Sequence, residues 1–259
     1  MLDLATILII ITSSQVLFLL FSLSTIESKN NRARIFLVLV LLFVLWYQLE
    51  FLAIRSAWDV SFNLLFGMRY GSWLALGPLL YFYTLASLSS DFRFQRKDGL
   101  HFLPFVVLTL LIPLGVEGLV TNRAVHYGML TVFDSWNREP ITTFQYVYGV
   151  IALGQFFVVF GYSLWSLHVI SRTEQALKDE YSNLQIASLR WQKVVHRATS
   201  IAVLLVAGYV VYQFYTTEYR RPTDYLFVVP LSVAVYLLSF QTLRYPQLFF
   251  IDRLGGSHT

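Results

Sequence analysis

Long apolar stretches separated by short polar segments form the dominant pattern of this chain. A membrane-spanning helix needs roughly 20 predominantly apolar residues, with about 17–25 as the usual range. Seven stretches meet this requirement, and each is expected to be helical because hydrocarbon offers no partner to an unpaired backbone group. The predicted spans are Leu4–Ile26, Ile35–Ile54, Gly67–Leu88, Leu100–Val120, Phe144–Ile170, Ala198–Tyr215 and Tyr225–Leu243. The pattern therefore predicts an all-α membrane protein, a bundle of seven transmembrane helices.

Composition supports a multi-pass membrane protein. Of the 259 residues, 56% are hydrophobic and only 13% are charged, whereas a soluble domain carries about 25% charged residues. The first apolar run lacks the basic start and the small-residue cleavage site of a signal peptide, so we expect it to be retained as the first span. We expect one transmembrane domain over residues 1–243 and a short cytoplasmic tail over residues 244–259.

The basic residues predict the orientation of the bundle. Cytoplasmic loops of membrane proteins carry an excess of Lys and Arg. If the spans alternate in direction, 13 of the 19 basic residues fall on one side and 6 on the other. The richer side holds Lys29, Arg32, Arg34, Arg93, Arg96, Lys97, Arg172, Lys178, Arg190, Lys193, Arg197, Arg244 and Arg253. This bias predicts an N-terminus outside and a C-terminus in the cytoplasm.

The predicted cytoplasmic segment between spans five and six has the pattern of an amphipathic helix over residues 173–195. Ser171 and Glu174 form a capping-box pattern that is typical of a helix start. One apolar stripe follows at helical spacing, with the members Leu177, Tyr181, Leu184, Ser188, Trp191 and Val195. We interpret the segment as an extension of spans five and six against the lipid headgroups. The alternative is a stalk for dimerisation or signal relay, in which Tyr181, Leu184 and Trp191 would take part.

Charged residues inside a membrane are costly and by default indicate a functional site. The only acids within the predicted spans are Glu50 and Glu117, both in the outer third of the bilayer by helix geometry. Further polar and aromatic residues are predicted at this level: Arg55, Arg69, Tyr148, Gln155, Tyr209 and Tyr212. Together they predict an outer pocket for a small amphiphilic ligand. The alternative is structural, with Glu50 paired to Arg69 and the tyrosines belonging to an interfacial belt.

The sequence contains no pattern that indicates an enzyme, a metal site or a cofactor. There is no cysteine, so thiolate ligands and cysteine nucleophiles are excluded, and no HExxH spacing occurs. Gly161-Tyr162-Ser163 lacks the final glycine of a G-x-S-x-G nucleophile elbow. His168 and His196 flank the amphipathic segment, and we expect them to lie at the interface and to bond to backbone or water. We expect a protein that is not an enzyme and binds no metal or cofactor.

Three groups of short motifs occur in a consistent order along the chain. They are Gly77-Pro78-Leu79-Leu80-Tyr81-Phe82-Tyr83 with Phe92-Arg93 and His101-Phe102-Leu103-Pro104-Phe105, then Tyr181-Ser182-Asn183 through Leu189-Arg190-Trp191, then Tyr245-Pro246-Gln247-Leu248-Phe249. With these motifs the chain resembles the seven-helix membrane sensor of bacterial AraC-type transcription regulators, a module that also precedes some sensor histidine kinases. The resemblance covers nearly the whole chain. It implies a sensory role in the bacterial inner membrane.

The resembled regulators carry a DNA-binding domain after the membrane module, whereas only about 16 residues follow span seven here. We therefore expect no direct nucleic-acid contact, and expect an output domain or partner protein, with the lipid bilayer and a second copy of the chain as further partners. Gly77 and Pro78 predict a kink that takes part in signal relay. The alternative function is a small transporter that uses the same outer polar layer. The inner halves of spans one, two and six are almost wholly aliphatic, which favours a pocket closed toward the cytoplasm.

Overall fold

The computed structural model describes residues 3–25, 31–55, 63–89, 91–116, 143–177, 183–215 and 225–244. This part of the chain consists of seven α-helices and one 3-10 helix, with no strand in it. The helices are α1 (Leu4–Thr25), α2 (Asn31–Arg55), α3 (Asn63–Leu88), η2 (Arg96–Phe102), α4 (Leu103–Val116), α6 (Thr143–Leu177), α7 (Asn183–Tyr215) and α8 (Tyr225–Arg244). The prediction of an all-α protein is confirmed, and each predicted span corresponds to one helix.

Three of these helices contain segments that are long and apolar enough to cross a membrane. The segments are Leu4–Thr25 in α1, Asn31–Leu49 in α2 and Leu153–Gln175 in α6. Their outward faces carry large apolar side chains, such as Phe21, which is 68% exposed, and Trp165, which is 61% exposed. An apolar surface of this kind is suited to lipid rather than to water. The chain is therefore a helical membrane protein.

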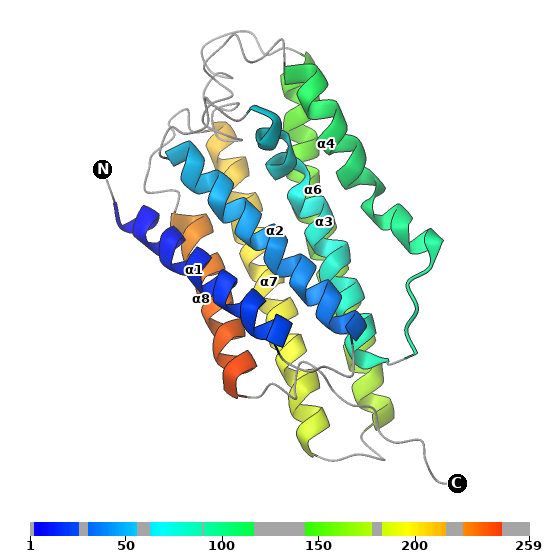
Figure 1. Ribbon diagram of the computed structural model, residues 1–259. Helices are drawn as coiled ribbons and strands as arrows, with labels where there is room; N and C mark the ends of the chain where they lie inside the picture. The colour runs from blue at the N-terminus through cyan, green and yellow to red at the C-terminus, as the bar shows by residue number, and fades with distance from the viewer. Residues whose placement is uncertain are drawn as a thin grey trace.

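The helices form an up-and-down bundle in which sequence neighbours are mostly spatial neighbours (Figure 1). Helix α1 packs between α8 and α2, α3 packs against both α2 and α6, and α6 packs against α7. Helix α4 lies against α3 at the side of the bundle. At the lower end in Figure 1, α1, α3, α6 and α8 end and α2 and α7 begin. We call this the basic end, because the helix ends and the connection that meet there carry Arg32, Arg34, Arg93, Arg172 and Lys193.

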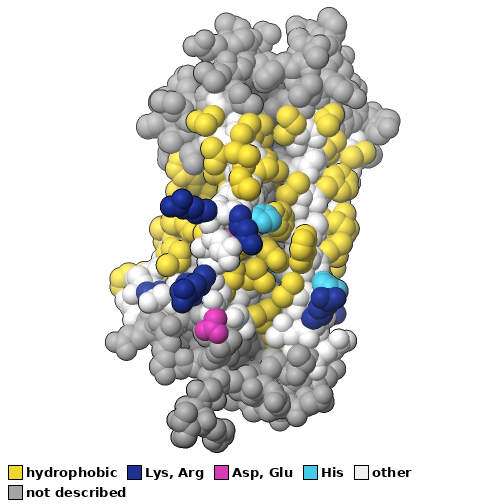
Figure 2. All heavy atoms as spheres, turned by 90° about the vertical axis from the view of Figure 1, so that its right-hand side faces the viewer, with side chains coloured by type: hydrophobic (Ala, Val, Ile, Leu, Met, Phe, Trp, Pro, Cys, Tyr) yellow, Lys and Arg dark blue, Asp and Glu magenta, His cyan; other side chains and the backbone are white. Residues whose placement is uncertain are grey.

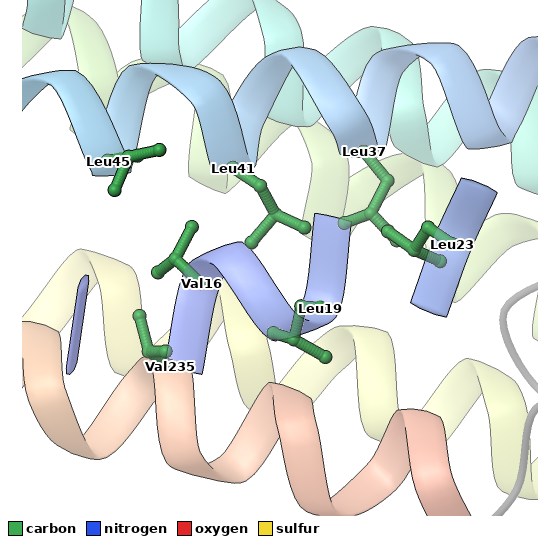
Figure 3. Packing of buried hydrophobic residues seen from close by; sticks show 7 residues of the cluster. All are labelled: Val16, Leu19, Leu23, Leu37, Leu41, Leu45 and Val235. Carbon is green, nitrogen blue, oxygen red and sulfur yellow. The ribbon is translucent and has the colours of Figure 1, made fainter. Parts of the chain in front are cut away.

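Apolar layers between α1, α2 and α8 hold one side of the bundle together. Figure 3 shows Val16, Leu19 and Leu23 of α1 facing Leu37, Leu41 and Leu45 of α2, with Val235 of α8 completing the cluster. Two polar contacts accompany this packing. The Ser13 hydroxyl donates to Oε1 of Gln48 on α2 at 3.1 Å, and the hydroxyl oxygens of Thr12 and Ser232 on α8 lie 2.8 Å apart. Hydroxyl and amide contacts of this type join helices within membranes.

The surface of the bundle separates apolar from basic regions. Figure 2 shows apolar side chains over the upper part of one face, whereas the Lys and Arg side chains occupy its middle and lower part. The connection between α3 and η2 contributes the exposed Arg93, and η2 begins with the exposed Arg96 and Lys97. Phe92 and Phe94 of the same connection pack against the rings of Phe36 and Phe82. The aromatic contacts fix the basic loop onto α2 and α3.

The predicted single helix over residues 173–195 is wrong. Glu174 on α6 and Lys193 on α7 form an ion pair, although a single helix would separate two residues 19 positions apart by about 28 Å. The segment is instead divided between the end of α6 and the start of α7, which pack side by side. Ser171 does not start a helix, because it lies inside α6. The segment therefore does not form one continuous surface helix.

Candidate functional site: a polar core between α3, α6 and α7

Helix α3 approaches α6 closely at Gly77. A Cβ atom at this position would lie 2.9 Å from Cδ2 of Tyr162 and 3.3 Å from Cα of Val159, so a larger residue requires the helices to separate. Pro78 follows inside the helix and removes one backbone donor. Both residues are buried. Gly77 thus allows α3 and α6 to pack closely, and its proximity to Val159 brings the next two turns of α3 alongside α6.

Below this contact, α3 meets α7 through a buried hydroxyl and an imidazole. Oγ1 of Thr84 lies 2.8 Å from Nε2 of His196, and the two residues are 0% and 2% exposed. Thr84 also donates its proton to the carbonyl oxygen of Leu80 at 3.0 Å. Since a hydroxyl has a single proton, Thr84 accepts a hydrogen bond from Nε2–H of His196. The ring is buried and meets no acidic group among the described residues, so it is neutral. Its Nδ1 atom is then an acceptor without a partner among the described residues.

One turn further along α3, the same arrangement recurs. Nε2 of Gln192 donates to the hydroxyl oxygen of Ser87 at 2.8 Å, and Ser87 donates to the carbonyl oxygen of Thr84 at 2.8 Å. Oε1 of Gln192 is buried and has no partner within the described part of the chain. Both residues of α7 thus donate toward α3 and each keeps one unused acceptor.

Serine hydroxyls extend this polar region along α6 and α7. Ser163 and Ser166 of α6 are 1% and 0% exposed, and Ser200 of α7 is 7% exposed. Ser163 and Ser166 follow Val159 at spacings of four and three residues, so they continue the side of α6 that contacts α3. Ser200 follows His196 by four residues and shares its face. We call the seven residues Thr84, Ser87, Ser163, Ser166, Gln192, His196 and Ser200 the polar core.

An apolar layer borders the polar core on the side away from the basic end. Phe156 and Val159 of α6 pack with Val203 and Val206 of α7, and Trp73 of α3 lies against them. The Trp73 and Phe156 rings are 5.4 Å apart in an edge-on arrangement. Tight apolar packing here excludes water from the helix contacts. The polar core therefore lies between this layer and the basic end.

A second histidine contact joins η2 to α6 at the level of Gly77. Nδ1 of His101 lies 2.5 Å from the hydroxyl oxygen of Tyr162, and the His101 ring packs edge-on against Phe82. Tyr162 in turn contacts the ring of Tyr81 on α3. The motif residues from Tyr81 to Phe102 thus meet in one aromatic cluster, although they are separated by a loop in the sequence.

For most of the predicted outer-pocket residues, the structure describes the backbone but not the side chain. The backbones of Glu50 and Arg55 belong to α2, that of Arg69 to α3, that of Tyr148 to α6, and those of Tyr209 and Tyr212 to α7. Glu117 lies outside the described residues. Gln155 is described and is 1% exposed, with neither amide atom bonded to a described residue. The outer pocket stays a prediction.

The structure places the predicted relay residues in different surroundings. Gly77 and Pro78 lie in the contact between α3 and α6. Trp191 is half-buried on α7, next to Gln192 of the polar core. Leu184 belongs to α7 by its backbone alone, and Tyr181 lies outside the described residues. His196 is buried against Thr84, so its predicted interfacial position with water or backbone partners is wrong, whereas His168 is exposed.

Sequence reasoning missed the polar core because its members are small or neutral. Its signal was nonetheless present: Gln192, His196 and Ser200 recur every four residues, which places them on one face of a helix. Buried polar side chains of α6 and α7 therefore occur on both sides of the apolar layer, with Gln155 on one side and the polar core on the other. The predicted closed pocket was inferred from the aliphatic inner halves of spans one, two and six. The polar core is instead formed by α3, α6 and the first turns of α7.

The polar core offers hydrogen bonds rather than charge. No group of three or more His, Asp or Glu residues that could hold a metal ion occurs among the described residues. Its hydroxyls, amide and imidazole suit the binding of neutral polar groups and the reversible joining of helices. Comparisons with protein-family models, with curated proteins and with solved structures find no match to this chain.

Proposed function

We propose that the chain is a seven-span sensor of the bacterial inner membrane, with its basic end in the cytoplasm. The stimulus acts in the outer half of the bundle, and the signal passes through α3 to α6 and α7 and then to a cytoplasmic output domain or partner protein. Support comes from the three apolar helices, the basic residues at one end, and the resemblance of the Gly77–Phe105 motifs to the sensor of AraC-type regulators.

The single observation that carries this proposal is the contact between α3 and α7. Two neutral hydrogen bonds, Thr84 with His196 and Ser87 with Gln192, link the helices at adjacent turns. Such bonds contribute on average about 0.6 kcal/mol inside membranes. A relay needs two arrangements of similar free energy that the stimulus stabilises unequally. An interface of weak, neutral bonds with unused acceptors beside them meets this requirement better than a purely apolar one.

The relay can be measured as a distance between two spin labels. Because the chain has no cysteine, Arg93→Cys and Arg190→Cys, both exposed at the basic end, give unique labelling sites. Pulsed electron paramagnetic resonance in nanodiscs of short-chain or long-chain phosphatidylcholine should show two distance populations. Thr84→Val should change their ratio, whereas Thr173→Val, outside the polar core, should not. One population that neither the lipid nor Thr84→Val changes would contradict the proposal.

A second candidate function is transport, and a specific observation favours it. Transport requires polar groups on the path to both sides of the membrane, and buried polar side chains occur on both sides of the apolar layer, Gln155 on one side and the polar core on the other. Ser166→Cys supplies the discriminating test in this cysteine-free chain. In a transporter, an impermeant thiol reagent modifies this position from either side of proteoliposomes. In a sensor with a closed core, modification from at least one side is absent.

A further inference from the structure

Three serines of the polar core lack a hydrogen bond that many hydroxyls within helices make. Ser14, for example, donates to the carbonyl oxygen of Ile10 in the preceding turn, and Ser239 donates to that of Val235. Ser163, Ser166 and Ser200 are buried, yet none has a hydrogen-bond partner among the described residues. Their protons are therefore available for another partner.

Unused acceptors occur on α7 as well, and Ser200 follows one of their residues, His196, by one turn on the same helix face. With the protons of Thr84 and Ser87 committed to backbone carbonyls, Nδ1 of His196 and Oε1 of Gln192 each lack a donor within the described residues. An unsatisfied buried polar group costs roughly 1–3 kcal/mol. Five buried polar atoms without partners, on α6 and one face of α7, therefore indicate an occupant that both donates and accepts hydrogen bonds.

We propose that the polar core is an internal binding site for a small neutral hydroxyl compound, either water or a short alcohol. A hydroxyl group can donate a hydrogen bond to Nδ1 of His196 or Oε1 of Gln192, and it can accept hydrogen bonds from the serine hydroxyls. The occupant is neutral because the polar core holds no acid, lysine or arginine, and the nearby Glu174 and Lys193 pair with each other. It is small because α3 and α6 approach so closely at Gly77.

A signalling role for the occupant rests on the proposed function, because the occupant would bridge the helices that move in the relay. The occupant itself is independent of any movement. Water bound inside a protein typically makes about three hydrogen bonds to otherwise unsatisfied groups. Its bonds to α6 and α7 would be lost or exchanged when these helices shift against α3.

X-ray hydroxyl-radical footprinting of the whole chain in nanodiscs tests the occupant, because radicals form from bound water. His196 should be oxidised several-fold faster, relative to its intrinsic reactivity, than Phe156, which is equally buried in an apolar layer. His168, which is exposed, gives the upper limit. The double variant Ser166→Ala with Ser200→Ala should lower oxidation of His196 alone. Equal protection of His196 and Phe156 in the wild-type chain overturns the proposal.

Thermal unfolding distinguishes the two hydroxyl sources. If a short alcohol binds, ethylene glycol should raise the Tm of the wild-type chain more than that of the serine double variant. Glycine betaine at equal osmolality should change the Tm of both chains by the same amount. If water alone binds, neither solute discriminates although His196 remains oxidisable. The relay fails separately: a single spin-label distance with an oxidisable His196 contradicts only the relay, whereas two distances with a protected His196 contradict only the occupant.

Discussion

Thr84 on α3 and His196 on α7 lie 112 residues apart in the sequence, yet Oγ1 of the first and Nε2 of the second are 2.8 Å apart. Both side chains are buried, and the bond connects two helices that are distant in the chain. Because Thr84 donates to Leu80, it can serve His196 only as an acceptor, so the imidazole donates from Nε2–H. This contact places α7 in register against α3.

Thr84→Val keeps the shape of the side chain and removes the acceptor of His196. We expect a destabilisation of about 1–3 kcal/mol, because Nε2–H is then left buried without its partner. Unfolding in mixed micelles with increasing dodecyl sulfate measures it. Thr173→Val is the matched control, since the Thr173 hydroxyl donates only to its own helix, at Val169. Equal losses for both variants would contradict the importance of the contact.

Gly77→Ala should destabilise the bundle by about 1–3 kcal/mol through overpacking. The new methyl group would lie 2.9 Å from Tyr162 and 3.3 Å from the backbone of Val159. Gly154→Ala and Gly161→Ala are controls in α6, where a Cβ meets nothing within 4 Å. Both controls should be neutral or stabilising by up to about 1 kcal/mol, because alanine favours a helix over glycine. The same unfolding assay orders the three variants, and an unaffected Gly77→Ala would exclude the close contact.

The α6–α7 hairpin is tested by a disulfide. Glu174→Cys with Lys193→Cys should crosslink within one chain under mild oxidation, since the native side chains form an ion pair. Proteolysis between the two positions followed by electrophoresis without reductant detects the bond. Each single variant controls for crosslinks between chains. A continuous helix over residues 173–195 would hold the two cysteines about 28 Å apart and would prevent the bond.

Two neighbouring serines of α1 should respond differently to the same change. Ser13→Ala removes the donor to Gln48 and leaves a buried amide oxygen without it, at an expected cost of about 1 kcal/mol. Ser14→Ala should change the free energy of unfolding by less than about 0.5 kcal/mol, because Ser14 is exposed and bonds only to Ile10. If the two variants are equally stable, the α1–α2 polar contact does not contribute.

Tyr162→Phe should lower stability by about 0.5–1.5 kcal/mol, the usual contribution of one hydrogen bond. The change removes the hydroxyl that lies 2.5 Å from Nδ1 of His101 and keeps the ring that packs on Tyr81. Tyr236→Phe on the exposed face of α8 is the control and should have no effect. Nitrogen NMR of labelled histidine should also show a shifted Nδ1 resonance of His101 in Tyr162→Phe alone.

A helix for each long apolar run could be predicted from sequence, because such a run has only one stable form in hydrocarbon. Not every limit could be predicted, since α7 begins at Asn183 instead of Ala198. Leu4–Thr25 and Tyr225–Arg244 lie within one residue of the predicted spans. The basic residues indicated one end of the bundle for a similar reason, since charges are costly inside it. Seven crossings and their direction remain predictions. The outer pocket also remains one, because most of its side chains lie outside the description.

The sequence by itself determined that the chain is helical and apolar enough for a membrane, and where its apolar runs lie. Only the tertiary structure decided which faces meet. In a membrane, lipid-facing and protein-facing sides of a helix are both apolar, so periodicity does not distinguish them. Serine is easily accommodated on either side, so Ser166 did not indicate which face of α6 is buried. Burying His196 against Thr84 and pairing Glu174 with Lys193 required contacts between distant segments, which no local pattern encodes.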